Sequence, residues 1–163
     1  MSASDDVLSR NASRSHSAPD DPLAASPSLR LAIVTCMDCR IDLYDAMGVK
    51  PGEAHAIRNA GGVVTDDVVR SLAISQRKLG TREVMLMHHT RCGMTSFSDD
   101  DFAAELERDA GRRPDWPAGA FQDTAQDVRE SVESLRENPF LLAESTVRGF
   151  VHDVDTDELT EVT

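Results

Sequence analysis

Short apolar runs alternate along this chain with segments of helical spacing, and this alternation constrains the fold more than any other feature. Residues 31–36 (Leu-Ala-Ile-Val-Thr-Cys) are rich in apolar and β-branched side chains, which predicts a buried strand. Further strands are predicted at residues 55–59, 83–88 and 149–153, with a short one at 159–162 that hairpins back. We therefore expect an α/β protein with a mostly parallel central sheet of four strands plus a short C-terminal strand, and helices on both faces.

Three helices are predicted between these strands. The first begins after its cap, Thr65, and ends at Gly80. Its expected apolar face consists of Val68, Leu72, Ile74 and Leu79. The second begins after Ser98, where a run of aspartates favours the positive end of the helix dipole. The third follows an apolar stripe that ends before Pro139 and consists of Phe121, Ala125, Val128, Val132 and Leu135.

Residues 1–29 differ in composition from the rest of the chain, because they contain eight serines and three prolines with few large apolar residues. We interpret them as a flexible or partner-crossing N-terminal arm with a short helix near residues 5–11, and residues 30–163 as one folded domain. The chain starts without a cationic segment and apolar core, which favours a cytoplasmic protein. No apolar run reaches the roughly 18 residues of a membrane-spanning helix, so we expect no membrane partner.

The formal net charge of −12 is unevenly distributed. Residues 1–92 carry 11 acidic and 11 basic side chains, whereas residues 93–163 carry 18 acidic and 6 basic ones. An acidic chain repels phosphate backbones, so nucleic acid is not an expected partner. We interpret the acidic half as a solvated surface.

Two segments rich in ligating side chains follow predicted strands. The sequence CMDCR (36–40) closes the first strand, and HTRCG (89–93) closes the third. If these strands are neighbours, Cys36, His89 and Cys92 converge on one point beyond the carboxyl ends of the strands. Two thiolates and one imidazole form a zinc ligand set that leaves a fourth tetrahedral position open, as catalytic zinc requires. The competing interpretation is a pair of buried cysteines and a core histidine.

Asp38 and Arg40 lie two and four residues beyond Cys36, beside such a metal. We expect Arg40 to keep Asp38 ionised through a charge-assisted pair. Asp38 would then accept the hydrogen bond of a zinc-bound hydroxide and orient it toward an electrophile. A purely structural ion pair is the alternative.

The order and content of these motifs resemble the β-class carbonic anhydrases, in particular their compact branch. The motifs are Cys36-x-Asp38-x-Arg40, Arg58-Asn-Ala-Gly61-Gly62 and His89-x-x-Cys92-Gly93. The resemblance implies a zinc lyase, a carbonate dehydratase that reversibly hydrates CO2 to bicarbonate and a proton. It implies a homodimer or higher homo-oligomer. For the site it implies metal ligands Cys36, His89 and Cys92, a catalytic pair Asp38 and Arg40, and a closed state in which Asp38 binds zinc.

The chain departs from the family pattern in two places. Cys39 stands where Ser or Ala is common, and we interpret it as a small buried residue. Many members contact substrate with a glutamine upstream of the first zinc cysteine, but this chain has no Gln before Gln76. The backbone N–H groups of Gly61 and Gly62 are therefore the candidate substrate contacts.

Alternative functions stay open at this point. The same zinc site could hydrolyse COS or CS2, because the motifs do not separate these substrates from CO2. A non-catalytic zinc or bicarbonate-sensing module would have no use for the Asp38–Arg40 pair. A thiol redox role for Cys36-x-x-Cys39 would need a thioredoxin-like setting, which the surrounding sequence does not match. The candidate proton shuttles are His55, His88 and His152.

Overall fold

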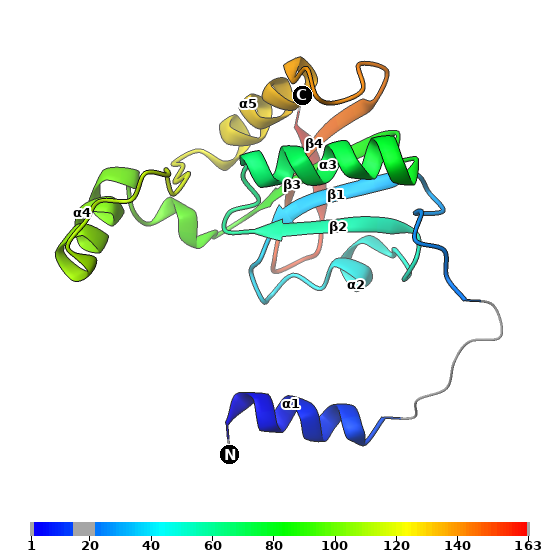
Figure 1. Ribbon diagram of the computed structural model, residues 1–163, viewed down its shortest axis with the longest axis horizontal. Helices are drawn as coiled ribbons and strands as arrows, with labels where there is room; N and C mark the ends of the chain where they lie inside the picture. Colours follow the sequence, from blue (N-terminus) through cyan, green and yellow to red (C-terminus); the bar gives the residue numbers. More distant parts are fainter. Residues whose placement is uncertain (1, 15–21, 163) are drawn as a thin grey trace.

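A five-stranded sheet forms the centre of the computed structural model, which describes residues 2–14 and 22–162 (Figure 1). The strands are β1 (Leu31–Cys36), β2 (Ala54–Asn59), β3 (Glu83–His89), β4 (Thr146–His152) and β5 (Leu159–Val162). Their order in the sheet is β2-β1-β3-β4-β5, with the first four parallel and β5 antiparallel to β4. The predicted α/β class and the C-terminal hairpin are confirmed.

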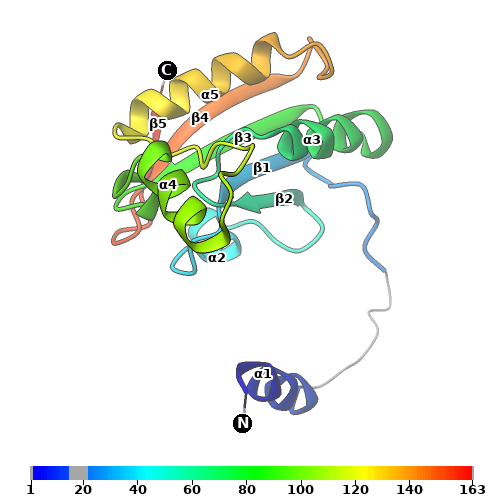
Figure 2. The same cartoon turned by 60° about the vertical axis from the view of Figure 1, so that its left-hand side comes forward.

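The described helices are α1 (Ala3–Ala12), α2 (Leu43–Met47), α3 (Asp66–Leu79), α4 (Asp99–Ala110) and α5 (Thr124–Glu137), with a 3-10 turn at Gly93–Thr95. Three of them, α2, α3 and α5, cover the two faces of the sheet. Thr65, Ser98 and Asp123 cap α3, α4 and α5 by accepting backbone N–H bonds from the first turn of each helix. Helices α3 and α5 lie over one face, and the short α2 lies against the other (Figure 2).

The period-two alternation of strand side chains divides the interior into two apolar layers. Ala32 and Val34 of β1 pack with Leu86 of β3 beneath α3 and α5. Ile33 and Met87 point the other way, toward α2. Because both faces of β1 and β3 are covered, these strands are buried along almost their whole length, as the apolar run at residues 31–36 predicted.

The predicted apolar face of α3 is partly wrong. Ile74 is 44% exposed, because a residue two positions after Leu72 lies on nearly the opposite side of a helix. Gln76 occupies the buried face instead. Its amide nitrogen donates to Ser145 Oγ at 3.1 Å and its amide oxygen accepts from the Leu142 N–H at 2.9 Å, so the buried amide is satisfied.

Two element boundaries also differ from the prediction. Phe121 precedes α5 and packs in the layer that faces α2, because Asp123 starts the helix three residues later than the apolar stripe suggested. Strand β4 begins at Thr146, earlier than predicted, because its pairing with β3 extends back to Glu83.

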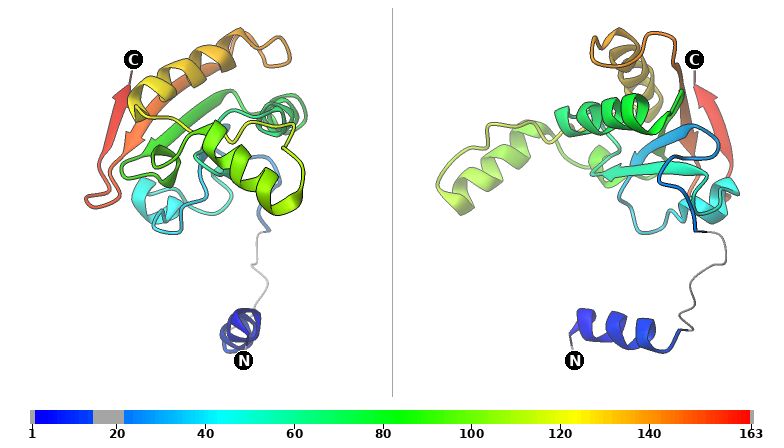
Figure 3. Two further views of the ribbon diagram at one scale, coloured as in Figure 1. Left: turned by 90° about the vertical axis from the view of Figure 1, so that its left-hand side faces the viewer. Right: turned by 45° about the vertical axis from the view of Figure 1, so that its right-hand side comes forward.

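Helix α1 confirms the helix predicted near residues 5–11, and the predicted arm falls partly outside the described residues. Figure 3 shows α1 standing apart from the sheet and α4 extending away from it. Neither helix has a buried residue. In the part of the chain that the structure describes, no helix combines the length and the apolar character needed to cross a membrane.

Candidate metal centre

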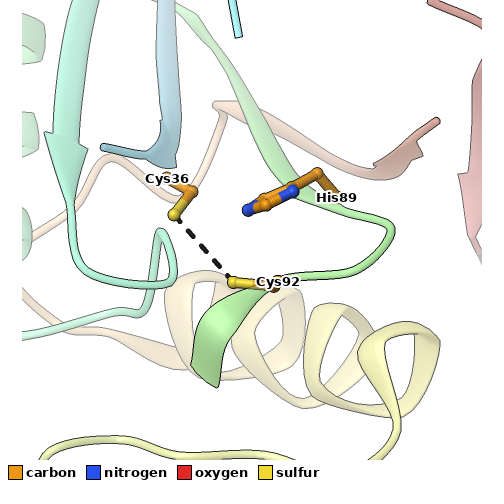
Figure 4. A group of neighbouring side chains, drawn as sticks. All are labelled: Cys36, His89 and Cys92. Atoms are coloured by element: carbon orange, nitrogen blue, oxygen red, sulfur yellow. Dashed lines mark hydrogen bonds between the residues drawn. The ribbon is translucent and has the colours of Figure 1, made fainter. Parts of the chain in front are cut away.

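The carboxyl ends of β1 and β3 lie side by side, and three ligating side chains meet there. Strand β1 pairs with β3 in parallel register up to Thr35 opposite Met87. Cys36 ends β1, His89 ends β3, and Cys92 follows in the next loop (Figure 4). The two sulfurs and a ring nitrogen of His89 lie within 4.8 Å of one another, and all three side chains are buried. The structure thus brings together the three residues that the sequence predicted to converge.

His89 is oriented as a metal ligand would be. Its Nδ1 lies 3.0 Å from the carbonyl oxygen of Thr90 and must donate to it, because a carbonyl only accepts. This tautomer leaves a lone pair on Nε2, a buried atom without a hydrogen-bond partner. A backbone acceptor on the far nitrogen is the usual way in which proteins orient a metal-binding imidazole.

The two sulfurs have the spacing that zinc requires. Cys36 Sγ and Cys92 Sγ are 4.0 Å apart, and two sulfurs at about 2.3 Å from a tetrahedral zinc are separated by about 3.8 Å. Two thiolates, one imidazole lone pair and no further protein ligand match the donor set of zinc sites that keep an open position. Among the described residues, this is the one group of three or more His, Cys, Asp or Glu side chains suited to hold a metal.

The two thiols lose their first proton readily and hold the second one between the two sulfurs. A hydrogen bond from Cys92 is the main cause that lowers the pKa of Cys36 to about 4, and His89 and the N–H groups of Asp38 and Gly61 act in the same direction against burial. The pKa of Cys92 is raised, first by its bond to Cys36 and then by burial. A second thiolate is unfavourable beside the first unless a cation lies between the two sulfurs. Metal binding would therefore release the remaining proton.

Asp38 and Arg40 form a two-point ion pair beside the group. Asp38 Oδ1 accepts from Arg40 Nε at 3.0 Å and from its backbone N–H at 2.9 Å, and Oδ2 accepts from Nη2 at 2.7 Å. These bonds hold the pKa of Asp38 well below its usual range. Asp38 Oδ2 also lies 3.8 Å from His89 Nε2, so an ionised carboxylate borders the metal position. The structure has Asp38 paired with Arg40, and a metal-bound Asp38 stays a prediction.

The turn at Gly61 and Gly62 directs its N–H groups into the protein. The Gly62 N–H donates to the carbonyl oxygen of Asn59 at 3.3 Å. The Gly61 N–H donates toward the sulfur of Cys36. Both groups already have acceptors within the chain, so the substrate contacts predicted there stay a prediction. The visible role of Gly61 is to support the sulfur of Cys36, and that of Gly62 is to close the turn.

Gly62 is required by the close approach of its turn to β1. Its φ is +74°, and a Cβ there would lie 2.8 Å from the carbonyl carbon of Thr35 and 2.9 Å from the nitrogen of Cys36. The left-handed conformation alone costs a residue with a side chain about 1–2 kcal/mol, and overpacking adds about 1–3 kcal/mol.

We expect Gly62→Ala to lower the free energy of unfolding by about 3 kcal/mol, measured by urea denaturation. Gly48→Ala is the matched control, because Gly48 also has a positive φ, +63°, but nothing lies within 4 Å of the added carbon. The control should lose only about 1 kcal/mol. Equal losses in the two variants would show that the contact with β1 adds nothing.

Several other predicted residues lie away from this centre or in unexpected surroundings. Cys39 is exposed and not buried as predicted, because the chain turns outward between Asp38 and Arg40. His88 is fully buried and forms a hydrogen bond with Asp127. His152 is also fully buried and forms a hydrogen bond with Asp157. His55 lies between Ser75 Oγ and the carbonyl oxygen of Ala25.

Sequence reasoning gave no role to two arginines that take part in backbone bonds around the site. Arg58 donates to carbonyl groups between Cys36 and Ile41. Arg91 has a positive φ of 54°, and its carbonyl oxygen accepts from Arg40 Nη2 at 3.0 Å. Arg58 stands in one of the motifs and Arg91 lies between two predicted ligands, but a sequence does not show which carbonyl groups a guanidinium reaches.

A parallel α/β sheet that carries a Cys₂His group and a carboxylate–guanidinium pair at its carboxyl edge defines a class of metal-site proteins. The carbonic anhydrase family matches residues 31–116 of the chain. β-Carbonic anhydrase 1 of Mycobacterium tuberculosis is 52% identical over 163 residues, which is 100% of this chain and 99% of that protein. The chain belongs to the β-class carbonic anhydrases.

Two further comparisons concern the fold and the activity. The crystal structure of a carbonic anhydrase from Streptococcus mutans superimposes with a TM-score of 0.89 at 38% identity, covering 100% of this chain and 99% of that one. A carbon disulfide hydrolase of Saccharolobus solfataricus is 32% identical over 158 residues, covering 80% of this chain and 76% of that protein. The chain is therefore also similar to a protein that is named for a second activity.

Proposed function

We propose that this protein is a zinc-dependent carbonic anhydrase, a carbonate dehydratase that hydrates CO2 reversibly to bicarbonate and a proton. One observation carries the proposal: the buried Cys36–His89–Cys92 group, with a free lone pair on His89, adjoins the Asp38–Arg40 pair. This arrangement occurs in a chain that is 52% identical over its full length to a β-carbonic anhydrase.

Cys36, His89 and Cys92 would hold the zinc ion. When bound, zinc lowers the pKa of coordinated water and so supplies a nucleophile near neutral pH. Two thiolates offset the formal charge of the ion and weaken this effect, so the groups around the site must contribute. The Asp38 carboxylate lies 3.8 Å from His89 Nε2.

Asp38 and Arg40 provide the orientation that the reaction needs. A carboxylate without a proton can only accept a hydrogen bond, so Asp38 accepts one from the water substrate and directs the oxygen lone pair toward CO2. Arg40 keeps the carboxylate ionised and fixed through both oxygens. Fixing the direction of attack lowers the barrier by pre-arranging the reactants.

Carbon disulfide or carbonyl sulfide hydrolysis is the second candidate, since the carbon disulfide hydrolase relative is 32% identical. Stopped-flow measurement of CO2 hydration on protein of verified zinc content, alongside turnover of CS2 and COS, decides between them. We expect CO2 to be the fastest substrate. Faster turnover of CS2 would establish the hydrolase, and zinc binding without any turnover would point to a sensing module.

We further propose a cytoplasmic homodimer in which residues 1–29 form an arm that reaches the partner and residues 30–163 form the zinc domain. Reduced thiolates are needed to hold zinc, which favours a reducing compartment. Val7 and Leu8 of α1 are 62% and 66% exposed, and an apolar groove over α3 includes the exposed Ile74 and Phe140. Burying such side chains against a second copy would stabilise both.

Replacing Val7 and Leu8 together by aspartate should shift the protein toward the monomer in sedimentation-velocity experiments. The reason is that two charges cannot be buried in an apolar interface at low cost. Ser4→Asp adds a charge to the same helix without removing an apolar side chain, so it should leave the sedimentation coefficient unchanged. A double variant that sediments like the unmodified protein would contradict the arm-exchange proposal.

A further inference from the structure

Arg58 reaches the metal-site loop from the neighbouring strand. It belongs to β2, which pairs with β1 so that Arg58 lies opposite Thr35. Its guanidinium donates to three backbone carbonyl groups from the end of β1 onward: Nε to Cys36 at 2.9 Å, Nη2 to Asp38 at 2.7 Å and Nη1 to Ile41 at 3.2 Å. One side chain thus bonds the start, the middle and the end of a six-residue segment.

That segment, residues 36–41, contains three of the five side chains that form the site. It supplies one sulfur of the metal group and both members of the Asp38–Arg40 pair. Two backbone N–H groups bond within the segment: that of Arg40 donates to Asp38 Oδ1, and that of Ile41 donates to the Asp38 carbonyl oxygen. The Met37 N–H donates outward, to the carbonyl oxygen of Asn59 on β2. The curvature that turns Asp38 back toward the metal position therefore depends strongly on contacts from outside the segment.

Arginine is the side chain suited to this task. Its guanidinium is a planar fork with five donors in fixed directions, whereas lysine presents one rotating ammonium on a flexible stem. Within residues 2–14 and 22–162 none of the ion pairs includes Arg58, so carbonyl groups are its bonding partners. Bonds from a charged donor are stronger than neutral ones and fix geometry better.

We propose that Arg58 is a positioning residue that holds residues 36–41 in the curvature that places the Asp38 carboxylate against the Cys36–His89–Cys92 group. The proposal rests on the proposed CO2 hydration. Arg58 acts through the backbone and does not contact the reacting atoms, because each of its described bonds ends on a carbonyl oxygen.

The test compares Arg58→Lys, Arg58→Ala and a control, Arg82→Ala, in the full-length zinc protein. Arg82 also donates to two backbone carbonyl groups, those of Gln76 and Thr81, at 3.1 and 2.7 Å, but it precedes β3 and so lies at the end of the strand opposite the metal position. We expect kcat/KM to fall about 10-fold in Arg58→Lys and about 10²-fold in Arg58→Ala, as a small misplacement of a reacting group produces. Arg82→Ala should keep the rate of the unmodified protein.

Two further readouts separate positioning from general damage. Hydrogen exchange should speed up in the peptide that covers residues 37–41 of both Arg58 variants, while zinc content and exchange in β3 stay unchanged. Guanidinium chloride, far below unfolding concentrations, should restore part of the rate of Arg58→Ala and none of the rate of Arg58→Lys, whose side chain fills the space.

The proposal is overturned if Arg58→Lys keeps both a normal kcat/KM and normal exchange at residues 37–41, because charge alone then suffices. It is also overturned if the Arg58 variants lose zinc in proportion to activity, or if exchange rises over the whole sheet. Failure of the unmodified protein to hydrate CO2 would refute the proposed function instead, and the exchange comparison would still decide the role of Arg58.

Discussion

Cys92→Ser is expected to lose bound zinc and CO2 hydration together. A serine hydroxyl stays protonated near neutral pH and is a poor ligand for zinc, so the site would keep only Cys36 and His89. Two ligands do not retain zinc in competition with a chelator. We expect the zinc content to fall in parallel with activity, and kcat/KM to drop by at least about 10³-fold, since the metal supplies the nucleophile.

Elemental analysis after dialysis against a chelator, together with stopped-flow hydration, measures both effects. Cys39→Ser is the matched control, because Cys39 is an exposed free cysteine three residues after Cys36. This control should retain zinc and most of the activity. If Cys92→Ser kept the zinc content of the unmodified protein, Cys92 would not be a metal ligand.

Asp38→Asn is expected to keep zinc and to lose most of the reaction rate. Asparagine has nearly the same shape, so the loop keeps its course, but it replaces a charged acceptor of two Arg40 bonds by a neutral group with its own donors. The amide no longer defines the direction of the water substrate. We expect kcat/KM to fall by about 10²–10³-fold, comparable with the loss of a preorganised electrostatic contact.

Asp67→Asn provides the comparison for this variant. Asp67 also pairs with an arginine, since Arg70 Nε donates to its Oδ1 at 2.8 Å, but both side chains are exposed on α3. Exposed pairs contribute little, so this variant should behave like the unmodified protein. A rate for Asp38→Asn close to that of Asp67→Asn, with zinc retained in both, would remove Asp38 from the mechanism.

Much of the metal centre could be predicted because its geometry follows from sheet topology. The apolar runs at residues 31–36 and 83–88 predicted two parallel strands, and parallel strands place their carboxyl ends together when they are neighbours. The structure shows that β1 and β3 are neighbours, and Cys36, His89 and Cys92 converge at their carboxyl ends, as was expected on that condition. The pairing of Asp38 with Arg40 is local, since one residue separates them in sequence.

Other features could not be predicted, because they depend on contacts between segments distant in sequence. The burial of Gln76 depends on residues 142 and 145, which supply its partners. The exposure of Cys39 depends on how the loop leaves β1, and that course is set in part by Arg58 on β2. No periodicity or cap in the sequence carries such information.

The sequence by itself determined the class of sheet, the capped helices and the residues able to hold a metal. These properties arise from the spacing of apolar side chains and from the chemistry of neighbouring residues along the chain. The tertiary structure alone decided which nitrogen of His89 is free, where the Gly61 and Gly62 N–H groups point, and which carbonyl groups Arg58 bonds. Hydrogen-bond partners are chosen in three dimensions within a fraction of an ångström, so they follow from packing and not from sequence spacing.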